Sequence, residues 1–230
     1  MKVLISREIA AQFSSATGIE AVSLPPYNKL DLPVQCHADM LFCVLDNKIF
    51  CYEEYVHLYD LLPTLAGQGY EVNFVEKGCD TKYPDDISLN VLVMGKTIFC
   101  NKAYTAQEIL EHASENGYTV VNVKQGYAAC STLVLDENTA ITADRGVCDA
   151  IKRQGKECLL VDGDDITLSG YSCGFFGGAS GVIGNNVYFF GDISGLKSGN
   201  EILDFLHRKN RAVFSISSGR VCDFGGFKVI

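Results

Sequence analysis

The segment Phe42-Cys-Val-Leu-Asp-Asn-Lys-Ile-Phe-Cys51 has the pattern of two apolar strands joined by a short Asp-Asn turn. Asn, Asp and Gly tolerate the positive φ angles that tight hairpin turns require. The same pattern recurs in Leu92-Val-Met-Gly-Lys-Thr-Ile-Phe-Cys100, Leu133-Val-Leu-Asp-Glu-Asn-Thr-Ala-Ile141 and Gly181-Val-Ile-Gly-Asn-Asn-Val-Tyr-Phe-Phe190. The chain therefore contains a repeated hairpin.

The spacing of these hairpins indicates a repeat architecture. Their turns open at Asp46, Gly95, Asp136 and Gly184, which are 49, 41 and 48 residues apart. A sequence period of about 40 to 50 residues is typical of propellers and other repeat proteins. We therefore interpret the chain as a series of similar units before considering any other fold.

Each unit also contains a helical stretch and a further strand. Apolar residues spaced near the helical period predict helices at about 7–16, 53–66, 105–116, 145–154 and 200–209. Each predicted helix ends close to a glycine or, in the last unit, to Asn210, and both residue types favour a left-handed helix stop. Strands are predicted next, at 20–24, 71–75, 119–123, 157–161 and 212–216.

These elements divide the chain into five units of about 46 residues: 1–46, 47–95, 96–137, 138–184 and 185–230. Units of this size bury too little core to fold alone, and closing them into a ring removes their exposed sheet edges. We predict an α/β fold in which residues 1–230 form a single domain, a five-bladed pseudosymmetric α/β propeller of strand-helix-strand-strand repeats. Its helices lie outside, and five irregular loops meet at the axis: 32–40, 77–89, 125–132, 168–181 and 217–227.

The composition narrows the possible partners. The 230 residues carry a net charge of −9, which disfavours nucleic acid and anionic membranes as partners. No apolar run approaches the ~20 residues of a membrane span, and no signal peptide is recognisable. We therefore expect a cytoplasmic protein with reduced cysteines. The acidic charge is compatible with a cationic small molecule as its substrate, and the sequence leaves both a monomer and a homodimer open.

The loop Lys124-Gln-Gly-Tyr-Ala-Ala-Cys130 places a cysteine between two predicted strands. His37 is the one histidine outside the predicted helices, and in extended chain the side chains of His37 and Asp39 would face the same side. His37 and Cys130 are 93 residues apart, about two repeat periods, so both belong to equivalent axis loops. A thiol near an imidazole and a carboxylate can act as a nucleophile. The residues alone also allow Cys130 to be a buried small side chain and His37 to be a loop residue bonded to a carbonyl.

A further acid, Asp223, lies in the last axis loop within Asp223-Phe-Gly-Gly226. This set of motifs resembles the pentein, or amidinotransferase-like, superfamily, which includes arginine deiminase, agmatine deiminase and dimethylarginine dimethylaminohydrolase. In those enzymes a His-x-Asp segment, a cysteine two blades later and an acid before Gly-Gly form the site. His37-Ala-Asp39, Cys130-Ser-Thr132 and Asp223-Phe-Gly-Gly226 are similar, and the repeat extends the resemblance over the whole chain.

The resemblance implies a cysteine-dependent hydrolase or amidinotransferase that acts on a guanidino or amidine compound and needs no metal or organic cofactor. Cys130 would form a covalent amidino-thioether, and His37 would act as general acid and base. Asp39 and Asp223 would hold the planar cation, since carboxylates pair bidentately with guanidinium groups. We also expect Tyr127 and Phe175 to contact the substrate. The chain departs from the family in loop 170–181, which has no charged residue where relatives usually place another acid.

Two other interpretations remain open at this point. A similar five-unit propeller occurs in a ribosome-binding anti-association factor, so the chain could be a non-catalytic scaffold that binds a protein or small ligand at its axis. The second interpretation is a metal or redox cluster, because every axis loop carries a cysteine: Cys36, Cys79, Cys130, Cys173 and Cys222.

Overall fold

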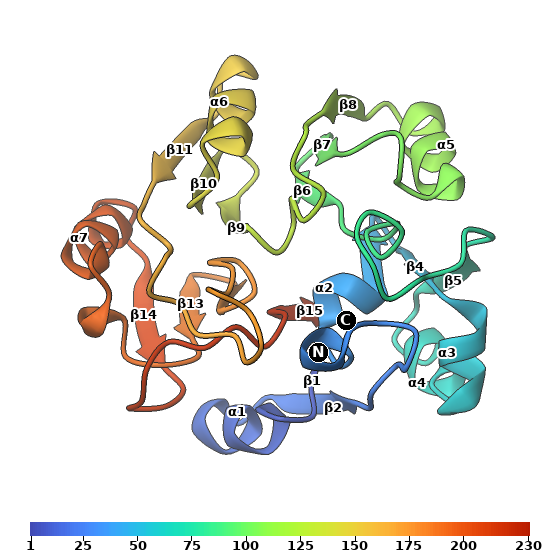
Figure 1. Cartoon of the computed structure of the whole chain (residues 1–230), viewed down its shortest axis with the longest axis horizontal. Coiled ribbons are helices and arrows are strands. Elements are labelled where there is room, and N and C mark those ends of the chain that lie inside the picture. Colours follow the sequence, from blue (N-terminus) through green and yellow to red (C-terminus); the bar gives the residue numbers. More distant parts are fainter.

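The computed structural model describes residues 1–230, and it contains five three-stranded sheets arranged around a central axis (Figure 1). The first sheet contains β15 (Phe227–Val229), β1 (Lys2–Ser6) and β2 (Glu20–Leu24). The others are β3 (Phe42–Leu45), β4 (Lys48–Cys51) and β5 (Glu71–Phe74); β6 (Leu92–Met94), β7 (Thr97–Cys100) and β8 (Thr119–Asn122); β9 (Thr132–Asp136), β10 (Thr139–Thr142) and β11 (Glu157–Leu160); and β12 (Ser180–Ile183), β13 (Asn186–Phe189) and β14 (Ala212–Ser215). The chain has the predicted five-bladed α/β propeller fold.

All five sheets have one pairing scheme. The strand nearest the axis is antiparallel to the middle strand, and the middle strand is parallel to the outer one. In four sheets the antiparallel pair is the hairpin that repeats in the sequence. In the first sheet β15 pairs with β1, and the amide of Lys2 donates to the carbonyl of Ile230 over 2.7 Å. The two ends of the chain therefore close the ring, and no sheet belongs to one sequence unit alone.

The helices cover the outside of the ring (Figure 1): α1 (Ala10–Thr17), α3 (Glu53–Leu58), α4 (Leu62–Ala66), α5 (Gln107–Glu115), α6 (Arg145–Arg153) and α7 (Gly199–Arg208). The prediction of one helix over 53–66 is wrong, because Asp60 has a φ of 49° and Pro63 lies in the first turn of α4. The predicted stops are present. Gly18, Gly117 and Gly155 each have a φ of 72°, and Asn210 has a φ of 54°.

The shorter elements are α2 (Ala38–Leu41) and the 3-10 helices η1 (Leu32–Val34) and η2 (Ile193–Gly195). Near the centre of the ring, α2 lies beside β15 (Figure 1). The amide of Asp39 in α2 donates to the carbonyl of Gly225 over 3.2 Å. This contact joins the first axis loop to the last one.

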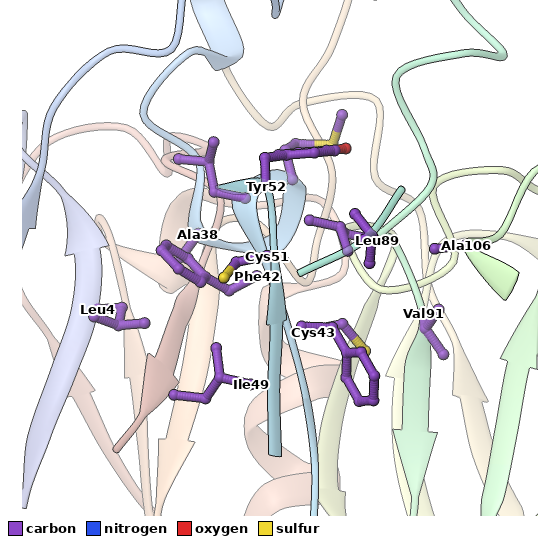
Figure 2. Packing of buried hydrophobic residues seen from close by; sticks show 14 of the residues in the cluster. Leu4, Ala38, Phe42, Cys43, Ile49, Cys51, Tyr52, Leu89, Val91 and Ala106 are labelled. Atoms are coloured by element: carbon purple, nitrogen blue, oxygen red, sulfur yellow. The ribbon is translucent and has the colours of Figure 1, made fainter. Parts of the chain in front are cut away.

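Apolar side chains fill the spaces between neighbouring sheets. Figure 2 shows Phe42, Cys43 and Ile49 packed with Leu4 on one side and Val91 on the other. All five belong to one cluster of 28 buried residues that also contains Cys130. Since the core extends from blade to blade, it holds the axis loops on a rigid frame.

None of the helices has the length and apolar character that crossing a membrane would need.

Candidate functional site

A cavity of about 230 Å³ lies among the loops that precede the inner strands. Five of the six residues predicted for the site line it: His37, Cys130, Asp223, Tyr127 and Phe175. The remaining lining residues are Val34, Met40, Leu168, Tyr171, Ser172 and Cys173. The structure thus brings side chains from the first, third, fourth and fifth axis loops into one small space.

The local structure around His37 differs from the prediction. His37 itself is extended, with φ −73° and ψ 122°, but its carbonyl accepts from the amides of Met40 and Leu41, so the chain turns into α2 directly after it. The premise that His37 and Asp39 lie on one extended strand is therefore wrong. Asp39 does not line the cavity; it lines a channel along the axis and stays close enough to interact electrostatically with His37 and Cys130.

Cys130 lies in the loop before β9 and is 3% exposed. The side-chain amide of Asn90 donates to its Sγ over 2.8 Å, and the Oδ1 of Asn90 accepts from the amide of Ala129 over 2.8 Å. Cys130 is thus both a buried side chain and a wall residue of the cavity. Its burial, which the sequence also allowed, is therefore compatible with a position next to a ligand.

Asn90 was missing from the sequence-based site, although the repeat contains a signal for it. The residue two positions before each inner strand lies close to the axis, and these residues are Met40, Asn90, Cys130, Gly178 and Gly225. Asn90 therefore occupies the position in its unit that Cys130 occupies in the next one. Aligning the units on their inner strands would have placed Asn90 beside the thiol.

Asp223 is held by main-chain donors. Its Oδ2 accepts from the amide of Phe175 over 2.8 Å, and its Oδ1 accepts from the amide of Gly225 over 2.9 Å. The same Oδ1 lies 3.7 Å from Nδ1 of His37. A Cβ on Gly178 would lie 2.1 Å from this oxygen, and a Cβ on Gly225 would lie 2.3 Å from the Cβ of His37. Both glycines are needed because no side chain fits there.

Burial controls the ionisation of these groups. It lowers the pKa of His37, against the opposite pull of the Asp39 charge, so the imidazole is neutral near pH 7. Burial raises the pKa of Asp223 to about 6, although the amides of Phe175 and Gly225 favour the carboxylate. It also raises the pKa of Asp39, against the pull of His37.

Burial raises the pKa of Cys130 well above that of a free thiol, and the charges of Asp39 and Asp223 add to the increase. The hydrogen bond from Asn90 acts in the opposite direction. The site therefore places a neutral thiol among acidic groups. A bound cation would offset those negative charges and lower the pKa of Cys130.

Aromatic rings form one side of the cavity. The ring of Tyr127 lies 5.5 Å from that of Phe175 and 5.5 Å from that of Tyr83, measured between centroids. No lysine or arginine lines the cavity. Flat aromatic faces together with a carboxylate suit a planar cation.

The five cysteines of the axis loops do not form one cluster. Of the five, Cys130 and Cys173 line the cavity, whereas Cys36, Cys79 and Cys222 do not. All ten cysteines are free, and no group of three or more His, Cys, Asp or Glu side chains is arranged to hold a metal ion.

A family model described as a family of unknown function, DUF6873, matches residues 3–227. The chain belongs to this family. No curated protein matches the chain in sequence.

Solved structures are similar to this chain over nearly its whole length. Dimethylarginine dimethylaminohydrolase from Pseudomonas aeruginosa has a TM-score of 0.57 at 10% identity, covering 92% of this chain and 79% of that one. Inosamine-phosphate amidinotransferase from Streptomyces griseus has 0.58 at 13%, covering 95% and 76%. Agmatine deiminase from C. jejuni has 0.54 at 10%, covering 89% and 72%. DUF6873 thus shares the pentein fold, as the resemblance in the sequence implied.

Proposed function

We propose that this DUF6873 protein is a cysteine-dependent hydrolase or amidinotransferase that acts on a guanidino or amidine compound through a covalent amidino-thioether on Cys130. The observation that carries the proposal is the shared cavity of Cys130, His37 and Asp223, with Asp39 behind it. The names of the similar structures support the substrate class, since they include a dimethylarginine dimethylaminohydrolase, an agmatine deiminase and two amidinotransferases.

Binding depends on charge and shape. The buried Asp223 carboxylate can accept hydrogen bonds from a planar amidinium group, and Tyr127 and Phe175 can cover its flat faces. Asp39 adds a second negative charge next to the thiol. Since no cationic side chain lines the cavity, an amidinium ion would be the positive partner that these acids lack.

The bound cation also prepares the nucleophile. By offsetting the charges of Asp39 and Asp223 it lowers the pKa of Cys130, so the thiolate forms mainly when substrate is present. His37 is neutral in the empty site and can accept the thiol proton. Sγ then attacks the central carbon of the amidinium group, and a carbon–sulfur bond forms.

The remaining steps return the site to its starting state. The carbon–nitrogen bond to the departing amine breaks, and His37 gives its proton to that nitrogen. Water, or an acceptor amine in a transferase, then attacks the amidino-thioether carbon while His37 takes one of its protons. The carbon–sulfur bond breaks, and the thiolate recovers the proton from His37.

Selective labelling tests this proposal. 2-Chloroacetamidine is a cationic amidine whose chloride a thiolate can displace, and 2-chloroacetamide is its neutral counterpart. We expect the cationic reagent to modify Cys130 at least about tenfold faster than the neutral one, because a charge-assisted hydrogen bond to Asp223 adds ~1.5 kcal/mol or more. Peptide mass spectrometry over all ten cysteines gives the rate at each thiol.

Two variants decide between the enzyme and the non-catalytic scaffold. Asp223→Ala should remove the preference for the cationic reagent, and His37→Ala should slow the reaction with both reagents, while circular dichroism shows that the fold persists. If Cys130 reacts no faster than the exposed thiols and shows no preference between the reagents, the enzyme proposal fails and the scaffold is the better description.

A further inference from the structure

Two tyrosines of the cavity wall are each paired with an aspartate outside it. The Tyr127 hydroxyl donates to Oδ2 of Asp86 over 2.6 Å, and the Tyr171 hydroxyl donates to Oδ2 of Asp31 over 2.7 Å. Asp86 belongs to the loop before β6, and Asp31 precedes η1. Neither Asp31 nor Asp86 lies in segment 170–181, where relatives usually place another acid, so these two aspartates are not that acid.

Asp86 is an unusual carboxylate for a loop. It is 5% exposed, and its Oδ1 is buried without any hydrogen-bond partner. An unpaired buried carboxylate oxygen is unfavourable unless a ligand or water supplies a donor. Burial raises the pKa of Asp86, and the charges of Asp85 and Asp31 add to the increase, whereas the hydrogen bond from Tyr127 acts in the opposite direction.

The two aspartates act on one small region. Burial raises the pKa of Tyr171 to about 12, and the charges of Asp31 and Asp86 add to the increase; burial followed by Asp86 likewise raises the pKa of Tyr127. Tyr171 is 47% exposed, so this side of the cavity is its open side. A ligand whose reacting carbon lies at Cys130 would extend its side arm past these two tyrosines.

The charges there determine which arm fits. The two acids repel a carboxylate on the ligand and attract an ammonium group, no lysine or arginine lines the cavity beside them, and the tyrosine faces add cation–π attraction. We propose that Asp86 and Asp31, with the rings of Tyr127 and Tyr171, bind a second cationic group of the substrate. The preferred substrate is then an amidine or guanidine whose side arm ends in an ammonium group. This inference rests on the proposed function.

Three N-substituted 2-chloroacetamidines test it: one with an aminopropyl arm, one with a propyl arm and one with a carboxyethyl arm. In each, the Cys130 thiolate displaces chloride and forms a carbon–sulfur bond, and the thiol proton passes to His37 or solvent. We expect the aminopropyl reagent to react about tenfold faster than the propyl reagent, because the negative charges behind the two tyrosines and the tyrosine faces themselves attract the ammonium group. The carboxyethyl reagent should be the slowest.

Variants locate the effect. Asp86→Asn should bring the aminopropyl rate to within about twofold of the propyl rate, since it removes the buried charge. Asp31→Asn should have a smaller effect because Asp31 is exposed. Asp85→Asn is the matched control, as it removes an exposed charge from the adjacent position and should leave the rates unchanged. Circular dichroism shows whether Asp86→Asn keeps its fold.

The outcomes separate the two proposals. If no reagent modifies Cys130 selectively, the amidine chemistry itself fails. If all three modify Cys130 at similar rates, or if the carboxyethyl reagent is fastest, the amidine site stands and the second cation site is overturned. An equal loss of aminopropyl preference in Asp85→Asn and Asp86→Asn would also overturn it, because general surface charge would then explain the preference.

Discussion

The cavity among the axis loops and the channel between the inner strands lie on the same axis and have similar volumes of about 230 Å³, yet they differ in composition. Four inner strands each contribute a valine to the channel, Val44, Val93, Val134 and Val182, and only the fifth contributes Lys228. The cavity instead is lined by four of the five axis loops, and His37, Cys130 and Asp223 each come from a different one of them. The five blades have similar residues in the inner strands, which pack against one another, and different residues in the loops that line the cavity.

The two regions meet at Asp39. Its carboxyl group lines the channel, its Oδ1 has no hydrogen-bond partner, and its charge acts on both His37 and Cys130. The inner strands therefore form a nearly symmetric frame, and the residues to which we assign the proposed chemistry are those that depart from the symmetry. Changes to cavity residues should affect reactivity, whereas changes in the channel should mainly affect stability.

The largest effect is expected from Cys130→Ser. The hydroxyl can still accept from Asn90, so the fold should remain, but covalent labelling by 2-chloroacetamidine should fall by more than about a hundredfold because a hydroxyl is a far weaker nucleophile than a thiolate. Intact-protein mass spectrometry measures the loss. Cys173→Ser, which changes the other cysteine of the cavity, should label as the original protein does. If Cys173→Ser removed the labelling instead, the nucleophile would have been misassigned.

The next largest effect is expected from a substitution that displaces the Asp223 carboxylate. In Gly178→Ala the new Cβ would lie 2.1 Å from Oδ1 of Asp223, so the carboxylate must move. We expect a loss of about 1–3 kcal/mol in the free energy of unfolding and loss of most of the preference for cationic reagents. Chemical denaturation and the labelling ratio measure the two effects.

Gly195→Ala is the control for this substitution, since a Cβ there meets nothing within 4 Å and its φ is not positive. It should leave both measurements unchanged. A Gly178→Ala variant with normal labelling would show that the position of Asp223 does not matter for cation binding.

A third prediction uses pH. The pKa of Asp223 is raised to about 6, so its carboxylate is charged above that pH and neutral below it. The ratio of cationic to neutral labelling should therefore decrease several-fold as the pH falls through about 6. Taking a ratio cancels the ionisation of the thiol that both reagents share. Asp39, whose pKa is also raised, should broaden the transition.

Asp223→Asn distinguishes the source of that pH dependence. The side chain keeps its shape and loses its charge, so the ratio should be low at every pH. A transition near pH 6 that persists in Asp223→Asn would assign the effect to another group, such as Asp39 or His37.

The sequence predicted the ring well because its signals are local and repeated. Hairpin turns such as Asp46-Asn47 and stops such as Gly117 need particular φ angles, and those needs are visible in residue type. That Asp39 lines the channel and not the cavity could not be predicted from such local signals. It depends on α2, whose position is fixed by the contact with Gly225, 186 residues away in sequence.

Asn90 was missed for a different reason. Residue types that carry chemistry drew attention to His37 and Cys130, whereas an asparagine is common in loops and acts here only through its position. Likewise, Asp86 became significant only once the structure showed that it is buried behind Tyr127. Burial and pairing are consequences of packing, and single-sequence patterns do not contain them.

Asn90→Asp tests the contribution of that position. The substitution keeps an acceptor for the amide of Ala129 but replaces the donor to Sγ with a negative charge, so the pKa of Cys130 should rise further. Labelling by the neutral reagent near pH 7 should slow about tenfold, since each pKa unit reduces the thiolate fraction by that factor. The pH profile of the rate should shift upwards. Asn185→Asp, on the turn between β12 and β13, should behave as the original protein.

The smallest effect should come from Lys228→Met, which replaces the lysine that the fifth inner strand contributes to the channel with an apolar side chain. Methionine keeps the length of the side chain, so packing against the valines should be preserved or improved, and the unfolding free energy should change by less than about 1 kcal/mol. Lys228 lowers the pKa of Asp39, and losing it should make Asp39 slightly easier to protonate. Labelling of Cys130 by 2-chloroacetamidine should therefore change by no more than about twofold, because Asp223 and the aromatic wall remain. A folded Lys228→Met protein that no longer labels would contradict the division between channel and cavity, and it would place Lys228 in the site itself.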